Sequence, residues 1–169
     1  MRGTRLGCTS VVVISATIPA AFGCSEYSFG DNAADRDDYA WFKGNTLDIG
    51  EPYAHPVALL EPNGFGLYDM HGNVWEWCRD YYDSDYYGKV ADPALDPENT
   101  QPAPARVLRG GCWYYGSQYG RCAYRGGSTP AGRRNARIGF RVILVGATSP
   151  QSPGDGAASA TKQLLNRCR

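Results

Sequence analysis

Oxygen-bearing side chains and glycines are concentrated in one short run, residues 63–78, which reads NGFGLYDMHGNVWEWC. Within it, Asp69, Asn73 and Glu76 offer carboxylate or amide oxygens, the ligand atoms that hard cations such as Ca²⁺ prefer. Three glycines allow backbone angles that other side chains forbid, as a tight loop requires. Two tryptophans then alternate with Val and Glu at the spacing of a strand. The run therefore predicts a structured loop, suited to a cation, that leads into a strand.

These residues also have a purely structural interpretation. Asp69 and Asn73 can satisfy the amides of a turn through side-chain hydrogen bonds. Glu76 can be a buried acid with a raised pKa, but its place between two tryptophans favours a structural network in which an Arg or an indole donates to it. The two histidines, His55 and His71, are isolated in the sequence and make a weak case for a metal, and we expect His71 to be exposed or hydrogen-bonded.

Length and composition restrict the class of protein. A chain of 169 residues fits one domain. Its 17 basic and 17 acidic residues balance, so charge gives no reason to expect nucleic acid or an anionic membrane as partner. Twelve tyrosines, four tryptophans, 21 glycines and 11 prolines favour short strands joined by many turns.

The chain divides into three segments, and the middle one contains the run and the strands that position it. Residues 1–25 resemble a weak signal peptide that is too short and polar for a membrane span, so export and a cytoplasmic location both stay open. Residues 26–145 form the domain, and residues 146–169, rich in Gly, Ala, Ser and Pro at their start, are expected to be disordered. Within the domain we predict a strand in the opening run and three more strands, at 106–115, 121–125 and 138–145.

Cysteine usage is ambiguous. Six cysteines are present but no C-x-x-C pair, so a zinc ribbon is unsupported. Cys112 and Cys122 lie ten residues apart and can converge across adjacent strands. A buried thiol or a disulfide is the ordinary interpretation of both residues.

Four ordered blocks resemble the formylglycine-generating enzyme family, the sulfatase-modifying domains. They are the run above and the stretches RVLRGGCW, RCAYR and IGFRV at 106–113, 121–125 and 138–142, with YSFGDN and YAW upstream at 27–32 and 39–41. The resemblance covers roughly residues 26–145. It implies an α+β, C-type-lectin-like fold of the sulfatase-modifying type, with little regular secondary structure and short, twisted antiparallel strands. The N-terminal half of the family domain has no match, so the domain is expected to be N-terminally truncated.

The resemblance also implies a calcium site just before the Trp-Glu-Trp stretch. Mapped residue by residue, Asp69 supplies a side-chain oxygen, and Met70, Gly72 and Val74 supply backbone carbonyls. Calcium is therefore an expected cofactor.

Copper is not expected. The family's oxidases bind Cu(I) with a cysteine pair, five residues apart, that follows the Gly-Gly block, whereas residues 113–120 here read WYYGSQYG. Cys112 and Cys122 flank the gap and are the remaining, weak candidates for catalytic thiols. We therefore expect a non-catalytic relative of the family that binds a peptide or another ligand or serves as an accessory domain, with an active oxidase of a sulfatase cysteine as the alternative.

Ligand binding fits the same region. Residues 113–136 are rich in Tyr, Gly, Ser, Arg and Asn, a composition resembling an antibody paratope. Ligand-binding variable proteins of diversity-generating retroelements share the family's fold and display this segment, which gives a further alternative. In the other interpretation, the tyrosines simply pack on a sparse core. The expected contacts to a peptide, a protein or another ligand are Trp113, Tyr114, Tyr115, Ser117, Gln118, Tyr119 and Arg134. The ligand and the oligomeric state stay open.

Overall fold

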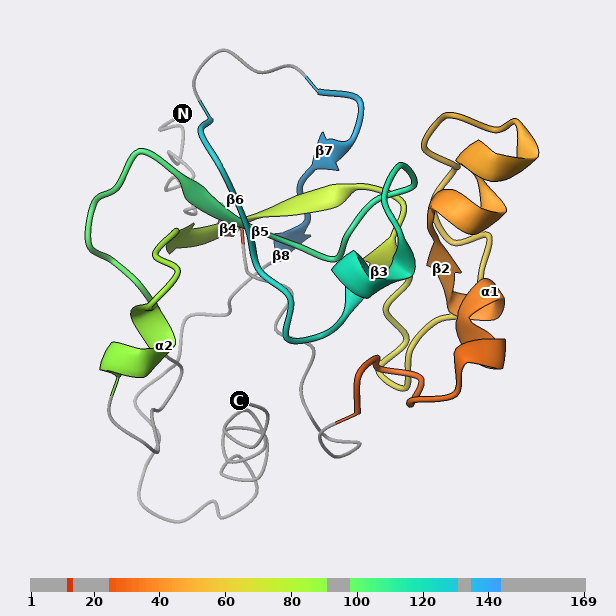
Figure 1. Cartoon of the computed structure of the whole chain (residues 1–169), viewed down its shortest axis with the longest axis horizontal. Coiled ribbons are helices and arrows are strands. Elements are labelled where there is room, and N and C mark those ends of the chain that lie inside the picture. Colours follow the sequence, from red (N-terminus) through yellow and green to blue (C-terminus); the bar gives the residue numbers. More distant parts are fainter. Residues whose placement is uncertain (1–11, 14–24, 91–97, 131–134, 144–169) are drawn as a thin grey trace, which may run out of the picture.

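A computed structural model describes residues 12–13, 25–90, 98–130 and 135–143 (Figure 1). Arg134, the predicted tail at 146–169, nearly all of the segment 1–25 and three of the six cysteines lie outside the described residues. In the part of the chain that is described, no helix is long and apolar enough to cross a membrane.

Regular secondary structure is sparse and every element is short, as expected for a chain with so many glycines and prolines. Within the described residues, two one-turn helices and four 3₁₀ turns accompany eight strands. The helices and 3₁₀ turns are α1 (Arg36–Tyr39), α2 (Tyr86–Lys89), η1 (Ala33–Asp35), η2 (Lys43–Asn45), η3 (Leu47–Ile49) and η4 (Ser117–Gly120). The strands are β1 (Val12–Val13), β2 (Ala40–Trp41), β3 (His71–Gly72), β4 (Trp75–Tyr81), β5 (Arg106–Arg109), β6 (Gly126–Ser128), β7 (Ile138–Gly139) and β8 (Val142–Ile143).

A four-stranded sheet with the order β6-β5-β4-β7 forms the centre of the molecule (Figure 1). β5 pairs antiparallel with both β4 and β6, and Trp77 lies opposite Leu108. β7 pairs parallel with β4, and β2 pairs parallel with β3. The α+β architecture is confirmed, and its sheets are mixed rather than purely antiparallel. α1 and β2 lie to one side of the sheet, in a layer of 3₁₀ turns and loops (Figure 1).

The hydrophobic core is small and largely aromatic. Trp75, Leu108 and Cys112 are buried at its centre, against a partly buried ring of Trp77, Tyr119, Tyr124 and Ile138. The alternation of β4 points Trp75 and Trp77 the same way, so both tryptophans reach this core, Trp75 more deeply. The alternating tryptophans of β4 therefore set which of its faces meets the core, and the partner strands supply the rest of the core.

Of the three further predicted strands, one ends earlier than expected, one is absent and one is interrupted. The strand predicted at 106–115 stops at Arg109 because Gly110 and Gly111 turn the chain with φ of 88° and 76°. Residues 121–125 form a turn instead, and the next strand, β6, begins at Gly126. The strand predicted at 138–145 is broken into β7 and β8 within its described part.

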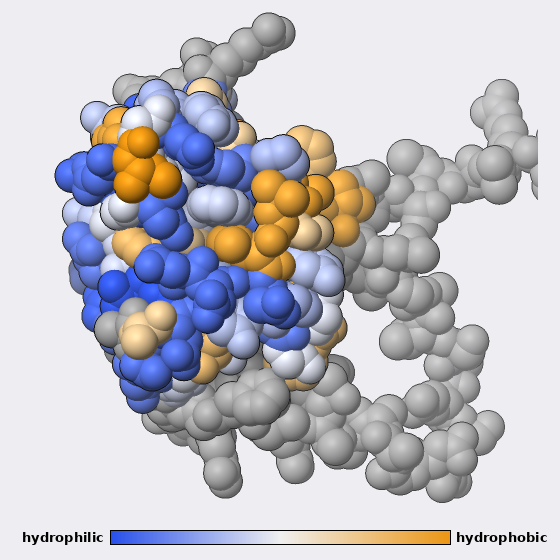
Figure 2. Space-filling view, turned by 90° about the vertical axis from the view of Figure 1, so that its right-hand side faces the viewer, coloured by the Kyte–Doolittle hydropathy of each residue, from blue (hydrophilic) through white to orange (hydrophobic). Residues whose placement is uncertain are grey.

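The described part of the face that carries α1 and β2 is mostly hydrophilic (Figure 2). Figure 2 views the side on which α1 and β2 lie and shows apolar residues gathered in a few places among polar ones. Over the described residues, the most exposed large apolar side chains are Val57, Phe140, Ile49 and Leu59, at 60–76%.

Gly72 joins the central sheet to the α1–β2 layer through close backbone contact. It has φ of 99° and lies opposite Trp41 in the parallel β2–β3 pair. A Cβ on this residue would lie 2.0 Å from the Trp41 carbonyl oxygen, well inside contact distance. On the other side, the Gly72 amide donates to the Gly110 carbonyl at 2.6 Å. Both the dihedral angle and the space therefore require glycine here.

We expect Gly72→Ala to lower the free energy of unfolding by at least about 3 kcal/mol, since it adds a backbone clash to left-handed strain. Gly50→Ala is the matched control, because Gly50 also has positive φ, 90°, but no atom lies within 4 Å of its added Cβ. Strain alone predicts about 1–2 kcal/mol for the control. Urea unfolding followed by circular dichroism measures both, and equal losses would show that the close approach is unimportant.

Candidate functional site

Residues 63–70 form an ordered loop that runs into β3 and β4, as the sequence predicts. Asn63 organises its start, because its Oδ1 accepts hydrogen bonds from the amides of Phe65 and Leu67 at 2.9 and 3.0 Å. The Asn63 carbonyl also accepts from Gly66 at 2.8 Å. The loop is therefore held by its own side chain, as in other asparagine-led turns.

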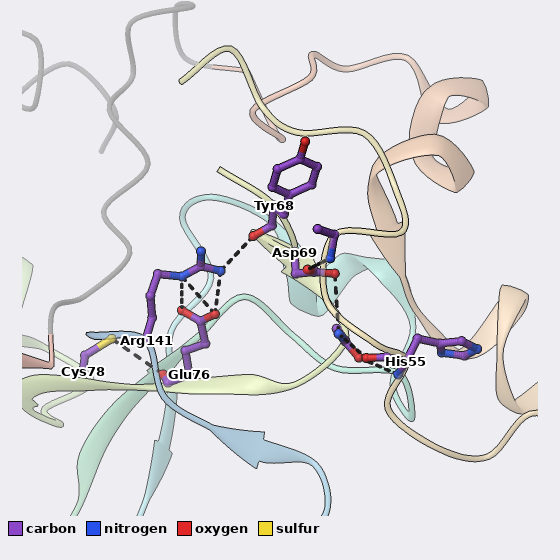
Figure 3. Close-up of polar contacts among 8 residues, drawn as sticks. His55, Tyr68, Asp69, Glu76, Cys78 and Arg141 are labelled. Carbon is purple, nitrogen blue, oxygen red and sulfur yellow. Dashed lines mark hydrogen bonds and ion pairs between the residues drawn. The ribbon is translucent and has the colours of Figure 1, made fainter. Parts of the chain in front are cut away.

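Glu76 and Arg141 form a nearly enclosed ion pair beside this loop (Figure 3). Glu76 is 9% exposed, and Arg141 Nε donates to its two carboxylate oxygens at 3.2 and 3.1 Å. The terminal nitrogen of the same guanidinium donates to Glu76 Oε1 and to the Tyr68 carbonyl, both at 2.8 Å. This arrangement is the structural network with an arginine that the sequence favours for Glu76, and it fastens the chain after β7 to the loop and to β4.

Asp69 serves the turn in the way that its structural interpretation predicts. It adopts φ of 56°, and its Oδ2 accepts the amide of Ala58 at 2.9 Å (Figure 3). Asn73, also left-handed at 57°, donates from Nδ2 to Asp69 Oδ1 at 3.5 Å and to the His55 carbonyl at 3.1 Å. The two side chains therefore hold the loop around residues 55–58 against the turn before β4.

The same turn gathers some of the oxygens that the calcium prediction needs. A Cβ built on Gly110 would lie 3.5 Å from the Met70 carbonyl oxygen and 4.0 Å from that of Val74, so both carbonyl oxygens lie near Gly110. Asp69 adjoins them, and each of its oxygens keeps a lone pair beyond the bonds above. No group of three or more His, Cys, Asp or Glu side chains suited to a metal occurs among the described residues. The residues therefore fit a hard cation in part, through backbone oxygens and one carboxylate.

The thiols beside the Gly-Gly block are poorly suited to copper. Cys112 is 2% exposed, Cys122 is half-buried, and both are free thiols, so the disulfide alternative is wrong for this pair. Burial raises the pKa of the Cys112 thiol, and it raises that of Cys122 to about 11. Because a metal binds the thiolate, these shifts disfavour Cu(I) at either residue near neutral pH.

The tyrosine-rich segment divides into exposed and buried positions. Tyr114 and Tyr115 are 40% and 38% exposed, and Gln118 is also exposed. Trp113, predicted as a contact, is instead buried at 7%, because it follows the Gly-Gly turn into the interior. Tyr119 is half-buried and packs against the core, and Ser117 is half-buried. Tyr114, Tyr115 and Gln118 are therefore accessible from solvent, whereas Trp113 and Tyr119 pack inward.

Sequence reasoning missed Arg137, a half-buried residue that contacts both exposed tyrosines. Its guanidinium carbon lies 4.5 Å from the centre of the Tyr114 ring and 5.8 Å from that of Tyr115. Such cation–π contacts orient aromatic rings. No local pattern links residues more than twenty positions apart, so only the arginine-rich composition of this half could have indicated the contact. We call Tyr114, Tyr115, Gln118 and Arg137 the tyrosine surface.

His71 is buried rather than exposed. It is 2% exposed, its Nδ1 lies 2.8 Å from the Gly120 carbonyl oxygen, and its Nε2 lies 2.7 Å from Ser28 Oγ. The hydrogen-bonded alternative of the prediction is therefore the correct one. His55 stacks on Trp41 with a centroid distance of 3.9 Å and contacts Glu51 at 2.8 Å.

Comparison with known proteins gives three kinds of match. Residues 16–145 match the family model of the sulfatase-modifying factor enzyme 1-like domain. The serine/threonine-protein kinase pkn1 of Chlamydia pneumoniae is 46% identical over 85 residues, which cover 50% of this chain and 14% of that protein. The formylglycine-generating enzyme of Streptomyces coelicolor is 40% identical over 101 residues, 57% of this chain and 31% of the enzyme. The chain thus spans less than a third of the length of either relative.

A solved structure shares the fold. Treponema denticola variable protein 1 matches with a TM-score of 0.58 and 31% identity, over 70% of this chain and 40% of that protein.

We expect Arg141→Ala to lower the free energy of unfolding by about 3 kcal/mol, because it leaves the enclosed Glu76 carboxylate without its cation. Arg79→Ala is the control, since the Arg79 side chain is 56% exposed in its pair with Glu98 and should cost less than about 1 kcal/mol. Denaturant unfolding distinguishes the two. Similar small losses would mean that the Glu76 pair does not fasten the fold.

Proposed function

The chain belongs to the sulfatase-modifying factor domain family, and we propose that within this family it is a non-catalytic domain that binds a peptide or protein ligand. The observation that carries the proposal is the replacement after the Gly-Gly block. The family's oxidases place a cysteine pair there, whereas this chain places two exposed tyrosines, Tyr114 and Tyr115.

The tyrosine surface has the properties of a recognition site. Tyrosine offers a large contact area with few rotatable bonds, and glutamine adapts its hydrogen bonds to the partner. The Arg137 guanidinium packs on the two rings before any ligand arrives, so less side-chain freedom is lost on binding. The Tyr115 carbonyl also accepts from the Lys43 amide at 2.9 Å, which fixes the backbone under the rings.

The chemistry of this surface favours a peptide with acceptor groups. Arg137 supplies a positive charge beside two phenol hydroxyls, and carboxylates or backbone carbonyls are their natural partners. A second candidate, a ligand-binding variable protein, is favoured by the 31% identity to the Treponema denticola variable protein. Both candidates use the same surface.

Calcium is the cofactor that we propose for the neighbouring turn. Asp69, with the carbonyls of Met70, Gly72 and Val74, would hold the ion, and the nearness of the Met70 and Val74 carbonyl oxygens to Gly110 supports this placement. A cation bound by these residues would stiffen the turn before β4, and through it the neighbouring Gly110 and Gly111. Its role would be structural, since none of its ligands belongs to the tyrosine surface.

For the binding proposal, we expect peptides selected from a random display library against the immobilised protein to bind Tyr114→Ala at least about tenfold more weakly. Tyr53→Ala is the matched control, because Tyr53 is 51% exposed but lies outside the tyrosine surface. Affinities are measured by biolayer interferometry on the purified chain.

Two results would contradict this proposal. Peptides that bind Tyr114→Ala and the parent protein equally would place recognition elsewhere. Conversion of the cysteine in a sulfatase Cys-x-Pro-x-Arg peptide to an aldehyde, with Cu(I) and oxygen present, would establish the alternative of an active oxidase. Mass spectrometry of the peptide detects that conversion directly.

For calcium, we expect the midpoint of thermal unfolding to rise when the chelated protein receives excess Ca²⁺, since a ligand bound only to the native state adds about 2.7 kcal/mol at a hundredfold excess over Kd. Asp69→Asn should keep the acceptor for Ala58 but lose most of the rise. Asp48→Asn, in the exposed pair with Lys43, is the control. An unfolding midpoint that does not change at millimolar calcium would contradict the proposed calcium site.

A further inference from the structure

An open cleft of about 480 Å³ lies away from the residues that the proposed function uses. One wall comes from residues between 25 and 30 together with Tyr39, the last residue of α1, and the other wall comes from residues 62–64. The volume suits a small molecule. No residue of the tyrosine surface lines this cleft, so a ligand bound in it would be separate from the proposed peptide.

Three aromatic rings form a parallel stack that ends at this cleft. Phe29 lies between Tyr27 and Tyr39, with ring centroids at 5.0 and 4.9 Å and ring planes inclined by only 9° and 14°. Tyr27 is buried, whereas Phe29 and Tyr39 are half-buried and line the cleft. Tyr39 is the last ring of the stack, since no further ring stacks on it among the described residues. A flat ring placed on Tyr39 would continue the stack in the geometry that aromatic pairs prefer.

Both walls of the cleft are held in place without a ligand. The Gly30 amide donates to the Tyr27 carbonyl at 3.1 Å, which closes the turn that carries Phe29. On the opposite wall, the ring of Pro62 fixes its own backbone angle, and Asn63 Oδ1 accepts two amides of its loop at 2.9 and 3.0 Å. A ligand therefore meets a preformed site, and little conformational freedom is lost on binding.

The polarity of the lining favours a neutral ligand with a hydrogen-bond donor. None of the eight lining residues is charged, so neither an anion nor a cation finds a counter-charge in the cleft. Ser25 Oγ, which donates to the Tyr27 carbonyl at 2.7 Å, keeps its lone pairs for a donor of the ligand. The other hydroxyl of this wall, Ser28 Oγ, is already held at 2.7 Å from His71 Nε2.

We propose that this cleft binds a small, neutral, planar aromatic molecule that carries an N–H or O–H donor. The ring of the ligand lies on Tyr39 and extends the stack of Tyr27, Phe29 and Tyr39 by one member. Its donor group bonds to Ser25 Oγ, and Pro62 contacts its apolar edge from the opposite wall. Stacking supplies most of the affinity, because the lining offers a ligand no charge and few polar groups.

The test compares four probes on the full chain: benzamide, its charged analogues benzoate and benzamidine, and its saturated analogue cyclohexanecarboxamide. Binding is followed by nitrogen-15 NMR of the Gly30 and Gly64 amides in the cleft walls, with Gly50, an exposed glycine outside the cleft, as the reference. We expect benzamide to shift the Gly30 and Gly64 signals but not that of Gly50, with a Kd near about 1 mM. The other three probes should bind at least about tenfold more weakly, since two lack a counter-charge in the cleft and the third cannot stack.

Substitutions at Tyr39 test the stack itself. Tyr39→Leu keeps an apolar side chain but loses the flat ring, so benzamide should bind at least about fivefold more weakly. Tyr39→Phe, which keeps the ring and loses only the hydroxyl, should restore most of the affinity. Tyr53→Leu is the matched control, because Tyr53 is 51% exposed and lies outside the cleft. Circular dichroism verifies that each variant is folded.

The probe series on the unaltered chain decides the proposal even where a variant does not fold. Gly30 and Gly64 signals that stay fixed at about 10 mM benzamide would overturn it. Equal or tighter binding of benzoate or benzamidine would contradict a neutral ligand, and equal binding of cyclohexanecarboxamide would contradict stacking. Each of these results would leave the tyrosine surface unaffected, since the two sites share no residue.

Discussion

Close backbone contact at residues 71–73 is the constraint on which the rest of the structure depends. Gly72 donates to Gly110, Asn73 donates to the Trp41 carbonyl, and Trp113 donates to the Asn73 carbonyl. Segments from three parts of the chain therefore meet within one turn, and a side chain on Gly72 would separate two of them. A fold with so small a core gains its definition from such hydrogen bonds, because apolar burial alone is modest here.

Local signals explain which features the sequence could predict. β4 follows from alternating tryptophans, and the arginine bound to Glu76 follows from the cost of enclosing a lone carboxylate. The ends of strands are harder to predict from sequence. Gly110 and Gly111 turn the chain, although the residue pattern after them still resembles a strand. Contacts between segments far apart in the chain could not be predicted from the sequence. Ser28 and His71 are 43 residues apart, and no periodicity encodes that meeting.

Reactivity and scaffold are separable in this protein. The sheet, the Gly-Gly turn and the Glu76–Arg141 pair provide the framework, whereas Tyr114 and Tyr115 after the turn are exposed to solvent. Buried thiols with raised pKa values sit close to where the family's oxidases need thiolates. One scaffold can thus carry different functions through a few substitutions in one segment.

The segment that carries the tyrosine surface is fixed at both ends and open between them. Trp113 is buried at its start and Gly120 at its end, while Tyr114, Tyr115 and Gln118 face solvent. Tyr115 also contacts the rings of Trp75 and Tyr119, so a substitution there reaches the core, whereas Gln118 has no such aromatic contact to lose. In evolutionary terms, the segment can diversify its solvent-facing chemistry most freely at Gln118.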